Sequence, residues 1–153
     1  MAKEDATFLL KMITPEQIIY QQRVKKITVT TLEGEITVLP FHTALIAAIK
    51  PGEIKIVEVS GSGSAEKERT MAVSEGVIEI RDNIVSLLVQ KAERAEELDR
   101  QKIEEAKKIA EQMIEKARRV GADKREFASL ETGLQREIAR LRVYEKYRKR
   151  KNL

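Results

Sequence analysis

The hydrophobic period of this 153-residue chain changes once, near residue 91. Before this point, short runs rich in β-branched residues alternate between apolar and polar, which is the period of a strand with one buried face. Runs of this length, separated by turn residues, are typical of a β-sandwich or barrel. From Lys91 onward, apolar residues recur every three or four positions, which predicts helices. The sequence therefore predicts an α+β chain with a mainly β domain, 1–90, and a helical domain, 91–153.

One strand run breaks the alternation. In "EIKIVEV" (53–59), Ile54 and Ile56 share a face, but Glu58 falls where the next apolar residue is expected. A bulge near Ile56, or a strand that changes its buried face, would explain the slip. Turn signals separate the strand runs, and they lie at 32–35, 51–53, 61–64 and 81–83.

The helical part contains two apolar stripes. The first consists of Ile103, Ala106, Ala110, Met113, Ala117 and Val120, and the second of Phe127, Leu130, Leu134, Ile138 and Leu141. Gly121 is suited to end the first helix and Asp123 to cap the second, so we expect an antiparallel helical hairpin. Because half of the first stripe is alanine, the hairpin buries little apolar area by itself and is expected to need another surface.

The composition argues against an enzyme. The chain has no cysteine and one histidine, His42, so it lacks a thiol nucleophile and the His/Cys pairs that metal sites usually need. No Gly-x-Ser-x-Gly elbow supplies a serine nucleophile. We expect His42 to be a structural or interface residue in a β-loop. The longest apolar run, 44–49, is far short of the roughly 20 residues that span a bilayer, and the polar N-terminus does not resemble a signal peptide, so we expect a soluble, intracellular protein.

Positive charge is concentrated at the C-terminal end. From Glu131 onward, eight Lys/Arg face three acidic residues, which gives +5 in a chain whose formal net charge is +4. Such a segment indicates an acidic partner surface, nucleic acid or an anionic membrane face. Tyr144 and Tyr147, interleaved with basic residues, would suit base stacking, so a nucleic-acid-binding module stays open as an alternative.

Four segments together resemble a known family. They are "ITPEQIIYQQRVKKITV" (13–29), "EGEITVLPFHTALIAAIKPGEIKI" (33–56), "VSEGVIEIRDNIVSLLVQKAERAEELD" (73–99) and "ARLRVYEK" (139–146). In this order and spacing they resemble the epsilon subunit of the F-type (rotary) ATP synthase, of the bacterial type. The resemblance implies a ten-stranded β-sandwich followed by two helices, in a non-catalytic subunit of the central stalk. Its sandwich would bind the gamma subunit and the c-ring, and its helices would inhibit ATP hydrolysis when they extend into the catalytic alpha/beta hexamer.

The resemblance also implies two sets of contact residues. The rotor interface to gamma and the c-ring would include Glu35, Leu39, Pro40, Phe41 and His42. Phe41 stands where the family usually has glycine, which raises the question of which backbone conformation it adopts. The inhibitory helix would use basic residues against an acidic segment of the catalytic β subunits, and these residues are Arg136, Arg140, Arg142 and Lys146.

Some bacterial relatives bind regulatory ATP, and a partial match to their pattern is present. The matching positions here are Glu93, Asp99, Lys102, Arg136 and Arg140. Lys102 replaces an arginine and loses its planar, two-pronged donor, Ile103 replaces a small alanine, and Ile109 stands near a second expected arginine. No cofactor is required by the resemblance, and a stand-alone ATP sensor is a further alternative.

The resemblance places the chain at the cytoplasmic face of a bacterial cell membrane, as a peripheral subunit held only through the complex. Nucleic acid is not an expected partner in that setting. The coupling ion, proton or sodium, is left open.

Overall fold

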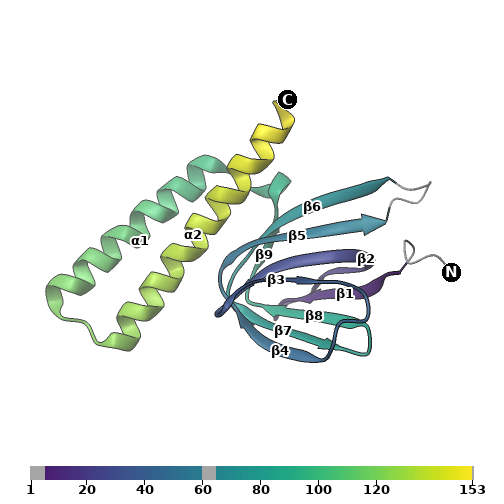
Figure 1. Ribbon diagram of the computed structural model, residues 1–153. Helices are drawn as coiled ribbons and strands as arrows, with labels where there is room; N and C mark the ends of the chain where they lie inside the picture. Colours follow the sequence, from purple (N-terminus) through teal and green to yellow (C-terminus); the bar gives the residue numbers. More distant parts are fainter. Residues whose placement is uncertain (1–5, 60–64, 153) are drawn as a thin grey trace.

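The computed structural model describes residues 6–59 and 65–152, so the turn expected at 61–64 lies outside the described residues. The described residues form a β-sandwich followed by two long helices (Figure 1). The strands are β1 (Phe8–Ile13), β2 (Ile18–Thr31), β3 (Gly34–Val38), β4 (Leu45–Ile49), β5 (Gly52–Val59), β6 (Glu66–Val73), β7 (Gly76–Arg81), β8 (Ile84–Val89) and β9 (Ala92–Arg94). A short 3₁₀ helix (Ala95–Glu97) leads to α1 (Arg100–Val120) and α2 (Lys124–Lys151).

The strands are hydrogen-bonded in the order β1-β8-β7-β4-β2-β5-β6-β9, with β3 paired to β2 and β1 also paired to β2. The 14-residue β2 serves both layers of the sandwich, because its first half pairs with β1 and its second half with β3 and β5. The described residues thus contain nine strands rather than the expected ten, with β2 counted once. Alternate residues of β1, β7 and β8 point into the core, as Phe8, Leu10 and Met12 of β1 illustrate.

β5 does not contain the expected bulge. It pairs with β6 without a shift from Gly52 to Val59, and the irregularity lies on the neighbouring strand, between Val24 and Lys26 of β2. Glu58 keeps the inward position that the alternation assigns to it and is 7% exposed. Val57, on the opposite face, is buried as well, on the side where α2 packs against β5. The prediction of a bulge near Ile56 was wrong. It assumed that one face of the strand is apolar and the other polar, but both faces of β5 are covered, so its residues need not alternate in this way.

The helical region begins later than predicted. Ala92–Arg94 form β9, which pairs with β6, and α1 begins only at Arg100 instead of near Lys91. A three-residue strand is too short to display a period of two, so the sequence gives no warning of it. The predicted caps are confirmed: Gly121 adopts the left-handed conformation (φ 69°) at the end of α1, and the Asp123 side chain accepts the Glu126 N–H at the start of α2.

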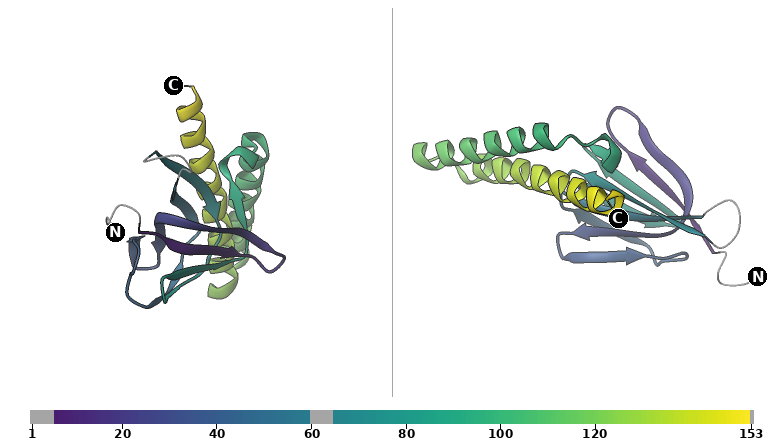
Figure 2. Two further views of the ribbon diagram at one scale, coloured as in Figure 1. Left: turned by 90° about the vertical axis from the view of Figure 1, so that its right-hand side faces the viewer. Right: turned by 90° about the horizontal axis from the view of Figure 1, so that it is seen from above.

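The hairpin rests on the sandwich through α2, which lies between α1 and strands β5 and β6. A second apolar cluster forms this contact, and it contains Ala72, Ala95, Leu98, Ile103 and Val143. The tip of the hairpin extends well beyond the sandwich (Figure 2). The helices thus use a surface outside the hairpin, as the alanine-rich stripe of α1 predicts.

Candidate functional site

The residues predicted for the rotor interface lie at the two ends of β3. Glu35 is the second residue of the strand, opposite Thr30 of β2, and it is exposed. Leu39 to His42 follow the other end of the strand. Since a strand rises about 3.3 Å per residue, Glu35 and Leu39 are roughly 13 Å apart along β3. The structure therefore brings Leu39, Pro40, Phe41 and His42 into one loop and leaves Glu35 apart from them.

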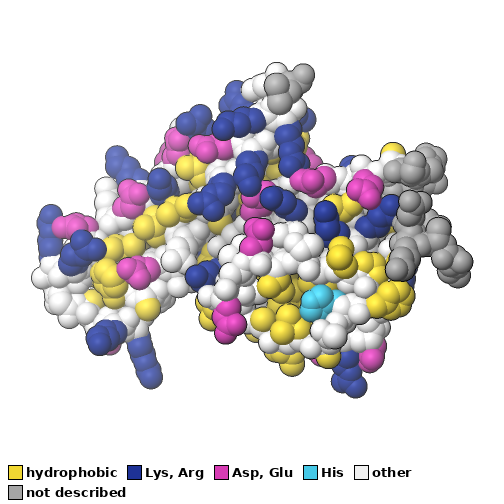
Figure 3. All heavy atoms as spheres, in the orientation of Figure 1, with side chains coloured by type: hydrophobic (Ala, Val, Ile, Leu, Met, Phe, Trp, Pro, Cys, Tyr) yellow, Lys and Arg dark blue, Asp and Glu magenta, His cyan; other side chains and the backbone are white. Residues whose placement is uncertain are grey.

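The loop presents apolar side chains to solvent. Leu39 is 55% exposed and Phe41 is 75% exposed. Phe41 adopts a left-handed conformation with φ 63°, which glycine adopts more readily than a residue with a Cβ. His42 is half-buried, and its Nδ1 lies 2.7 Å from the Thr43 carbonyl oxygen. Figure 3 shows this histidine among hydrophobic side chains, which suits a contact surface.

The outer face of one layer carries an apolar row that the sequence interpretation missed. Pairing across four strands aligns Ala48 of β4, Val77 of β7, Leu88 of β8 and Ile13 of β1. Leu88 is 46% exposed, and Ile46, on the same face of β4, is 73% exposed. Leu88 lies on the face of β8 opposite the buried Val85, Leu87 and Val89. An apolar residue on this second face was the sequence signal that could have revealed the row.

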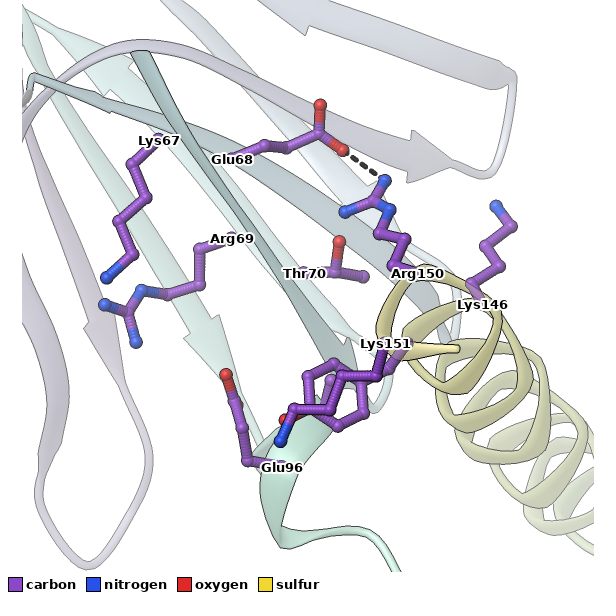
Figure 4. Close-up of a pocket in the computed structure, with 10 residues that line it drawn as sticks. Lys67, Glu68, Arg69, Thr70, Glu96, Lys146, Arg150 and Lys151 are labelled. Carbon is purple, nitrogen blue, oxygen red and sulfur yellow. Dashed lines mark hydrogen bonds and ion pairs between the residues drawn. The ribbon is translucent and has the colours of Figure 1, made fainter. Parts of the chain in front are cut away.

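The basic residues of α2 form ion pairs with carboxylates of the sandwich. Arg136 binds Glu75 before β7, with Nε donating to Oε2 at 2.7 Å, and Arg140 binds Glu93 of β9 at 2.6 Å. Lys146 pairs with Glu53 of β5, and Arg150 reaches Glu68 of β6 at 2.6 Å (Figure 4). Arg142 is exposed and forms no ion pair among the described residues. Three of the four predicted inhibitory residues are thus occupied by the sandwich in this conformation.

A cavity of about 210 Å³ lies where the last turns of α2 meet β6 (Figure 4). Arg69 of β6 lines it and is held by Glu58, with Arg69 Nε 2.8 Å from Glu58 Oε1. Lys151 lies over the Tyr147 ring, 5.3 Å from its centroid. This end of α2 therefore combines aromatic packing with a positively charged lining.

The residues that match the ATP-binding pattern are not gathered into one pocket. Glu93, Arg136 and Arg140 line a cavity of about 180 Å³, whereas Asp99 and Lys102 are not among its lining residues. The Asp99 side chain caps α1 by accepting the Lys102 N–H at 3.2 Å. Arg140 is engaged by both Glu93 and Glu137. This cavity is smaller than the roughly 300–1,000 Å³ that is usual for pockets that bind drug-sized ligands.

Comparison with known proteins decides the family. The family model described as "ATP synthase, Delta/Epsilon chain, beta-sandwich domain" matches residues 7–95, which is more than half of the chain. The chain belongs to the ATP synthase delta/epsilon family. It is a non-catalytic subunit of the central stalk, as the sequence resemblance predicts.

Two solved structures have chains to which this chain is similar, and the first of them supports the fold. A chain of the cryo-EM structure of the Euglena gracilis mitochondrial ATP synthase (OSCP/F1/c-ring) is 24% identical, with a TM-score of 0.69, and the match covers 88% of this chain and 79% of that one. A chain of the Tetrahymena thermophila mitochondrial ATP synthase central stalk/c-ring is 19% identical, with a TM-score of 0.48, over 58% of this chain and 67% of that one. The support for the fold rests on the first match.

Membership of this delta/epsilon family does not favour the nucleic-acid alternative, and neither does the packing of the tail. Tyr144 and Tyr147 are half-buried against the cluster that docks α2, so their rings are not free stacking surfaces. Within residues 6–59 and 65–152, no helix is both long and apolar enough to cross a membrane.

Proposed function

We propose that this chain joins the gamma subunit to the c-ring in a bacterial ATP synthase, peripheral to the cytoplasmic face of the membrane. The observation that carries the proposal is the apolar row on the outer face, in which Ala48, Val77 and Leu88 are exposed and Ile13 is half-buried, together with the Leu39–His42 loop. A contiguous apolar patch of this kind marks a protein interface more often than a solvated surface. The row would bind gamma, and the loop would extend the contact on the rotor. Glu35, at the opposite end of β3, would reach a separate part of the rotor.

Replacement of Leu88 by lysine tests the proposed interface. A charge in the centre of the apolar row would be desolvated on binding, so the Leu88→Lys chain should recover much less gamma from native membranes than the wild-type chain does. Val120→Lys is a matched control, because Val120 is also exposed but lies at the hairpin tip. Equal recovery of gamma by the Leu88 and Val120 variants would contradict the proposal.

The helices would regulate hydrolysis by moving between two positions. In the docked position, Arg136, Arg140 and Lys146 are bound to carboxylates of the sandwich. When α2 leaves the sandwich, these residues and Arg142 become available to an acidic segment of the catalytic β subunits. The same positive charges would thus stabilise both the docked and the inhibitory position, and the two positions exclude each other.

This function requires no cofactor. Regulatory ATP would have to displace Glu93 and Glu137 from Arg140, since the cavity beside these residues holds only about 180 Å³. We expect no binding of millimolar ATP to the isolated chain by calorimetry. Saturable heat that is lost on Arg140→Gln substitution would instead support an ATP-sensing role.

A further inference from the structure

Asn83, in the turn between β7 and β8, connects three separate segments of the chain. Its Oδ1 accepts the Phe41 N–H at 2.8 Å, and its Nδ2 donates to the Thr7 carbonyl oxygen at 2.8 Å. Its own carbonyl oxygen accepts the Leu9 N–H at 3.2 Å. One side chain therefore ties the Leu39–His42 loop to the start of β1.

The conformation of Phe41 needs such a tie. A residue with a Cβ is strained in the left-handed region, and Phe41 occupies it with φ 63°. Because Phe41 is 75% exposed, burial within the chain offsets little of this strain. Strained residues persist where the surrounding structure holds them, and they concentrate at binding sites. The hydrogen bond from Phe41 N–H to Asn83 is the contact that holds this one.

We propose that Asn83 is a positioning residue for the rotor contact, which locks the loop so that Phe41 and Leu39 form a fixed apolar tip for a partner subunit. The inference rests on the proposed function, because it assumes that the loop meets the rotor. The partner surface that fits such a tip is an apolar socket on another protein. If only a fraction of the molecules held the loop in its binding conformation, the apparent affinity for the partner would fall by that fraction. A tip that is fixed before binding avoids this loss.

Two substitutions at position 83 separate the hydrogen bond from the turn. Asn83 has φ 59°, which glycine adopts freely, so Asn83→Gly preserves the two-residue turn and removes both side-chain hydrogen bonds. Asn83→Asp keeps an acceptor for the Phe41 N–H and loses only the donor to Thr7. The positioning role predicts that the aspartate variant binds the rotor more tightly than the glycine variant.

The experiment measures the affinity of the full-length chain for ATP synthase from which this subunit has been removed. We expect Asn83→Gly to weaken binding by about 5- to 20-fold, and Asn83→Asp to remain within about 3-fold of wild type. Phe41→Ala should weaken binding as well. The double variant Asn83→Gly/Phe41→Ala should bind no worse than Phe41→Ala within about 2-fold, because Asn83 acts through the tip.

The outcomes separate the two proposals. If Phe41→Ala binds like wild type, the loop does not meet the rotor, and the proposed contact itself is wrong. If Phe41→Ala weakens binding but the two Asn83 variants bind alike, or the losses multiply in the double variant, the positioning role of Asn83 is overturned. The comparison isolates the hydrogen bond to Phe41, because both variants lose the donor to Thr7 and only the aspartate keeps an acceptor for the Phe41 N–H.

Discussion

At the residue scale, Gly76 has no room for a side chain. A Cβ at this position would clash with the Leu88 carbonyl oxygen and lie 2.9 Å from Val89 Cα, both of which belong to the paired backbone of β8. We expect Gly76→Ala to lower the free energy of unfolding by roughly 1–3 kcal/mol, measured by urea denaturation. Gly133→Ala is the control, because a Cβ there meets nothing within 4 Å in the middle of α2. It should stabilise the chain by about 0.5–1 kcal/mol, and equal effects of both substitutions would refute the close contact.

Glu58 is a buried acid that makes stability depend on pH. Burial alone would raise the pKa of Glu58, but hydrogen bonds from Arg69 and Tyr20 outweigh burial and lower its pKa below the ordinary value. The stabilisation is therefore present above the unfolded-state pKa of about 4.3, and it is lost as pH falls through the lower pKa of the folded state. Glu58→Gln should cost about 1.5–3 kcal/mol at pH 7.

Urea unfolding of the wild-type and Glu58→Gln chains between pH 7 and pH 3 tests this assignment. The difference between their unfolding free energies should stay constant above about pH 5 and shrink at more acidic pH. A difference that does not change down to pH 3 would mean that the carboxylate charge contributes nothing to the fold.

The same residues show why parts of the site could not be predicted. Glu58 was interpreted as a break in a strand, because alternation assumes that charged residues face water. Its partners Tyr20 and Arg69 come from other strands, and no local pattern links them to it. Asn83 was recognised only as a turn residue, since its contact with Phe41 joins positions 42 residues apart.

At the element scale, strands with one buried and one solvent-facing side were predictable, and strands that are covered on both sides or very short were not. β7 and β8 follow the alternation that their sequences display, with Ile78, Ile80, Val85 and Leu87 buried. β5 is covered on both faces, and β9 is only three residues long, so neither displays the expected period. For α2, the stripe from Phe127 to Leu141 was predicted, but the buried Ala139 and Val143 lie outside that stripe, and Val143 belongs to the cluster that docks the hairpin.

The ion pairs of α2 allow its two proposed positions to be weakened separately. Glu75→Gln with Glu93→Gln removes partners that exist only in the docked position, each worth about 0.2–1 kcal/mol, so the double variant should expose α2 to hydrogen exchange and lower the ATPase activity of the synthase. Arg142 lacks a docked partner among the described residues, so Arg142→Gln should raise ATPase activity and leave exchange in α2 unchanged.

Glu105→Gln serves as the control for this pair, since Glu105 is exposed on α1 and forms no ion pair within the described part of the chain. The account of two exclusive positions would be contradicted if Glu75→Gln/Glu93→Gln and Arg142→Gln changed ATPase activity in the same direction.

At the scale of the whole molecule, the chain combines a sandwich that has its own core with a helical hairpin that we propose to be displaceable. The sandwich has its own core and coincides with the family model over residues 7–95. The helices pack on it through a small apolar cluster and partly exposed ion pairs, and partly exposed ion pairs contribute only about 0–1 kcal/mol each. This division was predictable from the change of hydrophobic period, whereas the docked position of α2 depends on pairings between residues far apart in the sequence.

The most direct test of the central claim is to isolate the tagged, full-length chain from native membranes under mild conditions and to identify the chains that co-purify with it. A central-stalk subunit should recover gamma, the c-ring and the catalytic hexamer in the proportions of an assembled ATP synthase. Recovery of nucleic acid, or of the chain alone, would contradict the assignment to the rotor.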